Sequence, residues 1–231
     1  MVHAAIMAGS VPGRPLASVE SMSAWTIVLA AGSGQRFGAT KQFELLGDRS
    51  LVERTVATAS TVSDAVVVVV PPGHRWRGTA VDAVVPGGAT HGDSVRAGLA
   101  AVPTSVAISV VATASHPLAS AALYAAVIDR VQAGADAAAP AISSADAIKR
   151  VRNGTVVESI DKTELRIVQA PSAFRADMLR RVLADVGEAP EELELIERGG
   201  GVVATVPGEA TNVHIATPAD LEMARRLVAS P

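Results

Sequence analysis

The sequence contains no cysteine, few aromatic residues and no long apolar run. The absence of cysteine excludes disulfide bonds, thiol nucleophiles and thiolate metal sites. Aromatic residues make up 3% of the chain, which argues against an aromatic-rich binding surface. The longest apolar runs, such as residues 65–72, are far shorter than the roughly 20 residues that a membrane-spanning helix needs. We therefore expect no membrane partner.

The net charge and the length of the chain narrow the possible classes of protein further. A formal net charge of −3 gives no broad electrostatic footprint for nucleic acid, although it leaves room for a local cationic pocket. The 231 residues suit a single α/β domain. Residues 1–23 lack the basic start and unbroken apolar core of a secretory signal. We interpret residues 1–23 as a disordered tail and 24–231 as the folded domain of a cytoplasmic enzyme.

Strand-like and helix-like segments alternate along the folded domain. The strand-like segments are short and apolar on both faces, as in a parallel sheet covered by helices. This alternation predicts an α/β fold with a Rossmann-like, doubly wound and mostly parallel sheet, whose ligand lies beyond the carboxyl ends of the strands. We expect strands at 26–30, 65–70, 81–85, 106–112, 137–141, 202–206 and 213–215, and helices at 50–60, 93–101, 119–133, 175–186, 191–199 and 218–228.

Residues 146–172 interrupt this alternation. Within them, Asn153-Gly154 separates two strand-like segments, 147–152 and 155–160, and is a strong signal for a two-residue hairpin turn. We predict a β-hairpin that leaves the sheet as a dimerisation arm and packs on a second subunit. The alternative is a ribbon that merely lies on the surface.

A glycine-rich turn follows the first expected strand. Residues 29–42 read Leu-Ala-Ala-Gly-Ser-Gly-x-Arg-Phe-Gly-x-x-Lys-Gln, which matches neither a Walker loop nor a dinucleotide fingerprint. Small residues let backbone N–H groups approach a polyphosphate closely, and Arg36 and Lys41 add positive charge. These features favour nucleoside-triphosphate chemistry over the alternative, a surface turn with solvated cations. Such chemistry depends on positioning and electrostatic stabilisation, with Mg²⁺ held largely by the phosphates.

Several ordered motifs resemble one enzyme family. After the glycine turn, residues 87–99 read Gly-Gly-x-x-x-x-Asp-Ser-Val-x-Ala-Gly-Leu, and matching segments follow at 146–149, 169–174 and 212–221. This set resembles the 2-C-methyl-D-erythritol 4-phosphate cytidylyltransferases of the non-mevalonate isoprenoid pathway. The resemblance implies a homodimer that exchanges arms, Mg²⁺-bound CTP, CMP transfer to a small alcohol phosphate, 2-C-methyl-D-erythritol 4-phosphate, and release of pyrophosphate.

The resemblance also assigns roles to individual residues. A first group would cradle the triphosphate: Ala30, Ala31, Gly32, Ser33 and Gly34. Arg36 and Lys41 would be catalytic, because they would stabilise charge on the transferring phosphoryl group. Gly88 and Ser94 would line the base and ribose pocket. No metal-ligating side chain is identified.

The chain departs from the family mainly at the positions that would bind the acceptor. Thr113 stands where the family has a carboxylate, and His116 and His214 stand where it has an arginine and a lysine. The other substituted acceptor positions are Ala147, Lys162 and Ala170. An imidazole is shorter than these cations and largely neutral at pH 7, so it grips a phosphate dianion poorly. Two alternatives therefore stay open: a transferase with another acceptor or base, and a catalytically silent nucleotide-binding paralogue.

Smaller motifs allow two further expectations. The position of Asp93 suits an N-cap of the helix that follows the glycine pair. We expect a solvated helix start at Glu191, Glu192 and Glu194, because the helix dipole favours acidic residues there. The alternative is that these carboxylates bind a cation. Ala89 and His91 replace an acidic and a basic residue of the family, which leaves the choice of base open.

Overall fold

The computed structural model describes residues 22–32, 34, 37–38, 40–184 and 191–229. Residues 1–21 of the expected tail therefore lie outside the described residues. The remaining two belong to the packed structure: Met22 packs against the core, and the Ser23 carbonyl oxygen accepts a hydrogen bond from the Ile108 N–H at 3.0 Å.

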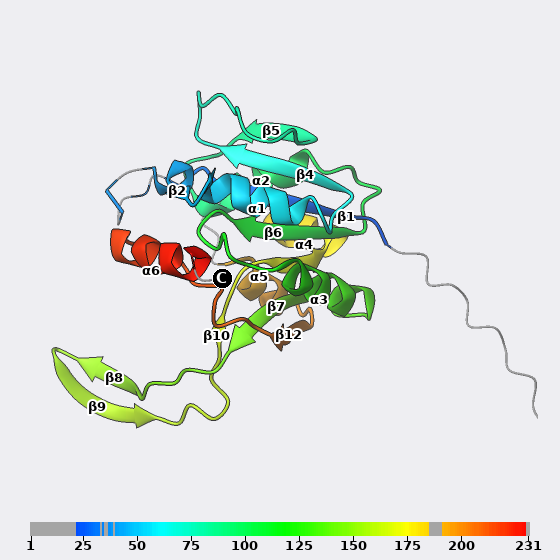
Figure 1. Ribbon diagram of the computed structural model, residues 1–231. Helices are drawn as coiled ribbons and strands as arrows, with labels where there is room; N and C mark the ends of the chain where they lie inside the picture. Colours follow the sequence, from blue (N-terminus) through cyan, green and yellow to red (C-terminus); the bar gives the residue numbers. More distant parts are fainter. Residues whose placement is uncertain (1–21, 33, 35–36, 39, 185–190, 230–231) are drawn as a thin grey trace, which may run out of the picture.

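Eight strands form a central mixed sheet in the order β10-β7-β11-β6-β1-β4-β5, and β12 also pairs with β7 (Figure 1). The inner strands β6, β1, β4 and β5 are parallel, whereas β11 is antiparallel to both neighbours and β10 to β7. β12 is parallel to β7. The bounds are β1 Ala24–Leu29, β4 Ala65–Val70, β5 Ala83–Pro86, β6 Ile108–Thr113, β7 Ala137–Ile142, β10 Ile167–Val168, β11 Ser172–Arg175 and β12 Val203–Pro207.

Helices cover both faces of this sheet, which explains why all six residues of β4 are buried. α1 (Leu51–Ala59) and α3 (Ala121–Gln132) contribute to one apolar core. α2 (His91–Ala100), α4 (Ala176–Ala184) and α5 (Glu192–Arg198) contribute to the core on the opposite face. The predicted doubly wound α/β fold is thus confirmed. No helix in the described part of the chain has the length and apolarity needed to cross a bilayer.

A smaller cluster completes the fold beside the glycine turn. α6 (Pro218–Ala229) packs there against a short hairpin formed by β2 (Leu45–Leu46) and β3 (Arg49–Ser50). The 3₁₀ turn η1 (Lys41–Phe43) precedes this hairpin in the chain. The C-terminal helix is therefore next to the segment that carries Lys41.

Several elements differ from the sequence-based expectation; the short strands β2, β3 and β10, for example, were not predicted. Residues 213–215 form no strand: the Ile215 N–H donates to the Ser115 carbonyl oxygen at 2.8 Å, but no strand ladder follows. Conversely, β11 lies where the sequence predicts the end of the arm segment at 172 and the start of a helix at 175, yet it inserts between β6 and β7. β11 is a strand because it pairs with strands that are distant in sequence, and such pairing leaves no local signal in the residues themselves.

The arm forms the predicted β-hairpin, with β8 (Ile148–Arg152) and β9 (Thr155–Ile160) as a separate two-stranded sheet. Asn153 and Gly154 have φ values of 50° and 77°, which a two-residue hairpin turn requires. The hairpin projects away from the main sheet (Figure 1) and exposes Val151, Val156 and Val157. Its expected role in dimerisation stays a prediction.

Candidate active site

A cavity of about 940 Å³ opens at the carboxyl ends of β1, β5 and β6. The segments that follow these strands form its walls, and parts of 168–172, 191–193 and 214–216 complete them. Ligands of doubly wound folds bind at this end of the sheet, because the crossover connections there diverge to opposite faces. The fold and the cavity therefore place the candidate site where the sequence predicts it.

The glycine turn forms one wall of this cavity. Ala30, Ala31, Gly32 and Gly34 all line it. The Gly34 carbonyl oxygen accepts hydrogen bonds from the N–H groups of Phe37 and Gly38, both at 2.9 Å, and Gly34 has a φ of 66° that a side chain would strain. Ser33 and Arg36 lie outside the described residues. The phosphate-binding role of the turn stays a prediction.

Lys41 faces the cavity from the first position of η1. Its Nζ donates a hydrogen bond to the Ile215 carbonyl oxygen at 2.5 Å, which ties the turn to a segment 174 residues away. Nearby, the buried Gln42 donates from Nε2 to the Gly32 carbonyl oxygen at 3.0 Å. Among the described residues that line the cavity, Lys41 is the only lysine or arginine.

The glycine pair after β5 packs against the glycine turn. A Cβ atom built on Gly87 would lie 2.3 Å from the Ala31 Cβ, so a side chain would force the two loops apart. The Ser94 hydroxyl accepts from the Gly88 N–H at 3.3 Å and donates to the Thr90 carbonyl oxygen at 3.1 Å. Gly88 and Ser94 both line the cavity, and Ser94 also holds the loop that carries Gly88.

The N-cap of α2 is Thr90, so the expectation for Asp93 is wrong. The Thr90 hydroxyl accepts from the Asp93 N–H, and the Asp93 carboxylate accepts from the Thr90 N–H, both at 3.1 Å. This reciprocal pair is a capping box, in which the acidic residue occupies the third helical position. The Thr-x-x-Asp spacing was the overlooked signal.

An ion pair connects the starts of α2 and α5 at the rim of the cavity. His91 Nε2 lies 2.8 Å from Glu192 Oε1, and both residues line the cavity. Glu192 is 8% exposed, so the expectation of a fully solvated helix start is wrong for this residue. The hydrogen bond to Glu192 raises the pKa of His91 above its usual value, against an opposing effect of burial.

Removing this partner should lower the pKa of His91. We expect Glu192→Gln to bring the pKa of the His91 imidazole back toward its ordinary value, as followed by NMR titration. Because the folded-state pKa is raised, the pair stabilises the fold fully below the unfolded pKa of about 6.5, and this stabilisation is lost as the pH rises through the folded value. The advantage of wild type over Glu192→Gln in denaturant unfolding should therefore shrink at alkaline pH.

A control variant on the same helix tests this assignment. Glu194 pairs with Arg198 on the exposed surface, so Glu194→Gln should leave the titration of His91 unchanged. An unchanged His91 pKa in Glu192→Gln would show that the contact does not form in solution.

Four of the substituted acceptor positions meet at the other side of the cavity. Thr113, His116, Ala170 and His214 all line it. The rings of His116 and His214 stack with centroids 4.8 Å apart and an interplanar angle of 21°. Burial lowers the pKa of His116 to about 4, and the nearby His214 and Lys41 act in the same direction. His116 is therefore a neutral imidazole at pH 7.

The remaining two acceptor positions do not reach the cavity of the same chain. Ala147 is exposed at the base of the arm, just before β8. Lys162 follows β9, and its Nζ donates to the carbonyl oxygens of Ser144, Ala145 and Asp146 at 2.7–3.2 Å. These contacts tie the two sides of the arm together at its base.

Sequence reasoning assigned no role to two buried polar side chains beside the cavity. Gln169 donates from Nε2 to the carbonyl oxygens of Glu209 and Asn212, at 2.8 and 3.1 Å. Asn212 donates from Nδ2 to the Ala170 carbonyl oxygen at 2.7 Å. Both side chains thus fix the segment around Ala170, which lines the cavity. The signal for them was that Gln169 begins the motif segment 169–174 and Asn212 begins the segment 212–221.

The described residues include no group of three or more His, Cys, Asp or Glu side chains that could hold a metal ion. The Thr113 hydroxyl, at the position where the family has a carboxylate, accepts a hydrogen bond from the Ser115 N–H at 3.3 Å.

Comparisons with known sequences agree with this architecture. The family model of 2-C-methyl-D-erythritol 4-phosphate cytidylyltransferase (IspD) matches residues 24–230. The bifunctional enzyme IspD/IspF of Anaeromyxobacter dehalogenans is 38% identical over 89% of this chain and 57% of its own length. The 2-C-methyl-D-erythritol 4-phosphate cytidylyltransferase of Nocardia farcinica is 36% identical over 87% of this chain and 92% of its own. The chain thus spans slightly more than half the length of the bifunctional relative.

A comparison with solved structures gives the same result. The crystal structure of 2-C-methyl-D-erythritol 4-phosphate cytidylyltransferase from Thermus thermophilus superposes with a TM-score of 0.78 and 30% sequence identity. The match covers 90% of this chain and 98% of the other.

Proposed function

Since this chain belongs to the 2-C-methyl-D-erythritol 4-phosphate cytidylyltransferase family, we propose that it transfers CMP from CTP to 2-C-methyl-D-erythritol 4-phosphate. In this reaction a phosphate oxygen of the acceptor attacks the α-phosphorus of CTP. The bond from that phosphorus to the bridging oxygen of the β-phosphate breaks, and pyrophosphate leaves. The product is a CDP-alcohol for isoprenoid biosynthesis.

The cavity at the carboxyl ends of β1, β5 and β6 is the observation that carries this proposal. Its glycine turn offers closely packed backbone for a triphosphate, and Lys41 offers a positive charge beside it. No covalent intermediate with the protein is needed, because holding two phosphates in line and stabilising their negative charge lowers the barrier. We assign the charge-stabilising role to Lys41 and, outside the described residues, to Arg36.

We propose that Mg²⁺ accompanies the nucleotide, mainly through its phosphate oxygens. Mg²⁺ bound in this way would neutralise part of the charge that gathers at the α-phosphorus.

We propose further that the chain forms a homodimer through the arm. Exposed valines on β8 and β9 support this idea, since Val151, Val156 and Val157 are each more than half exposed in one chain. An arm that packs on a second subunit would also bring Ala147 and Lys162 toward the partner's cavity. Neither residue lines the cavity of its own chain. A cytoplasmic location stays a prediction.

The decisive experiment measures pyrophosphate release from each nucleoside triphosphate with a panel of alcohol phosphates. Turnover with CTP and 2-C-methyl-D-erythritol 4-phosphate is the expected result. Turnover only with another acceptor or base would replace the substrate assignment, and nucleotide binding without any turnover would identify a silent binding module. The relatives described above carry the name of the first activity, which favours it over these two alternatives.

A further inference from the structure

The cavity extends to both sides of the glycine turn that follows β1. In the sheet, β6 is next to β1 on one side, and β4 followed by β5 lies on the other. Thr113 and His116, which occupy acceptor positions of the family, lie at and just after the end of β6. The β5 side, where Gly88 and Ser94 line the cavity, is therefore left for the nucleoside of CTP.

A carboxylate lines this β5 side of the cavity. Glu192 is the first residue of α5 and is 8% exposed, and its Oε1 lies 2.8 Å from His91 Nε2 at the start of α2. His91 precedes Ser94 by one helical turn, and the Ser94 hydroxyl accepts from the Gly88 N–H at 3.3 Å. The ion pair thus holds the Glu192 carboxylate beside the loop that lines the nucleoside side.

The negative charge of Glu192 limits which part of a nucleotide can lie next to it. A carboxylate repels the phosphates, whereas the Lys41 ammonium attracts them toward the glycine turn. The ribose is joined to the α-phosphate, so the base is the part of CTP that lies farthest from the triphosphate. A carboxylate has about four lone-pair sites, so Glu192 can accept from His91 and from a base at the same time.

Cytosine and uracil differ in the group that such a carboxylate would contact. Cytosine carries an exocyclic amino group, N4, which donates hydrogen bonds, and carboxylates accept from it in protein–DNA complexes. Uracil carries a carbonyl oxygen, O4, at the same position, and it would leave both itself and the carboxylate without a donor. Ala89 offers no polar side chain for this contact, although the family has an acidic residue there.

We propose that Glu192, positioned by His91, selects cytosine by accepting a hydrogen bond from its exocyclic amino group. This inference rests on the proposed function and specifies which residues distinguish CTP from UTP. His91 is a positioning residue, because its Nε2 donates to Glu192 Oε1 and so directs the remaining lone pairs of the carboxylate to the base.

The test measures the calorimetric Kd of CTP and of UTP for the full chain, with Mg²⁺ and without an acceptor. Wild type should bind CTP at least about 100-fold more tightly than UTP, and Glu192→Gln should reduce this preference by about 10- to 100-fold. The glutamine can present its oxygen to cytosine N4 or its amino group to uracil O4. UTP should therefore bind Glu192→Gln more tightly than wild type, a gain that a damaged site would not produce.

Two variants of His91 test its positioning role. His91→Gln keeps a side-chain N–H that can donate to Glu192, so most of the preference for CTP should be retained. His91→Ala removes this donor, so the preference should fall although Glu192 is still present, and an unchanged preference would refute the role. Glu194→Gln is the matched control, because Glu194 pairs with Arg198 on the exposed surface of α5. Thermal unfolding confirms that each variant is folded.

Three results would overturn the inference. Wild type could bind CTP and UTP equally, or Glu192→Gln could weaken both nucleotides by the same factor. The third result is that Glu192→Gln weakens CTP but not dCTP, which would place the carboxylate at the ribose 2′-hydroxyl.

Failure of the proposed function gives a different result. Pyrophosphate release would then be absent with every acceptor, while CTP binding and its dependence on Glu192 would persist. Absence of binding of either nucleotide to wild type would overturn both the inference and the proposed function.

Discussion

Lys41→Ala should lower kcat for pyrophosphate release by about 100- to 1,000-fold, which corresponds to a barrier increase of about 2.7–4 kcal/mol. The expected size of this loss in kcat follows from the position of the Lys41 ammonium group. Lys41 is the only lysine or arginine among the described residues that line the cavity, and its hydrogen bond to Ile215 fixes its direction before substrate arrives. A preorganised charge needs no rearrangement during the reaction, so its loss falls mainly on the chemical step.

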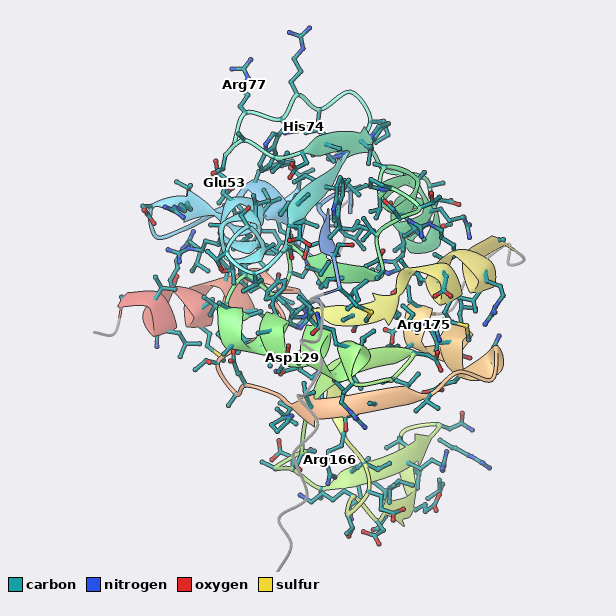
Figure 2. All side chains as sticks on the ribbon, turned by 90° about the vertical axis from the view of Figure 1, so that its right-hand side faces the viewer. Glu53, His74, Arg77, Asp129, Arg166 and Arg175 are labelled. Carbon is teal, nitrogen blue, oxygen red and sulfur yellow. The ribbon has the colours of Figure 1, made fainter. Side chains whose placement is uncertain are left out.

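Two control variants distinguish a catalytic role of Lys41 from a structural one. Lys41→Met keeps most of the aliphatic side chain but not the charge, so it should lose as much kcat as the alanine variant. Arg77, labelled in Figure 2, is an exposed residue of the loop between β4 and β5, and Arg77→Ala should retain wild-type kcat. Normal turnover in both Lys41 variants, with unchanged thermal unfolding, would remove Lys41 from the mechanism.

The inner sheet was predictable because its signals are local. β4 has the predicted bounds, since six consecutive small or β-branched apolar residues suit a strand buried on both faces. The hairpin turn was equally local, because Asn153-Gly154 adopts the positive φ values that most residues avoid. Positions of this kind specify their conformation before any tertiary contact forms.

The features that the sequence did not predict depend on distant partners. β11 is a strand because β6 and β7 flank it, and Glu192 is buried because His91 lies opposite it across the rim. Likewise, motif comparison placed His116 and His214 in the acceptor site, but not their stacking on each other. The sequence motifs thus identified residues that line one cavity, whereas the contacts between residues distant in sequence required coordinates.

The close packing of α2 on the sheet gives the prediction with the largest expected effect on stability. α2 crosses the sheet at Gly98, where a Cβ atom would lie 2.3 Å from Ile27 Cγ2 and 3.0 Å from Val69 Cγ2. Both partners are completely buried, so neither has room to yield. We expect Gly98→Val to destabilise the fold by about 3 kcal/mol. At roughly 2–4 °C per kcal/mol for a domain of this size, Tm should fall by about 6–12 °C.

A matched substitution in the same helix shows whether overpacking is the cause. Ala100→Val introduces the same side chain at an exposed position of α2, where only the helix propensity of valine, about 0.5 kcal/mol, should be lost. Ile27→Ala alone should cost about 2–5 kcal/mol, because it leaves a cavity. In the double variant the new valine occupies that cavity, so the two losses should be less than additive by about 0.5–3 kcal/mol. Additive losses would mean that α2 does not pack on β1 through Gly98.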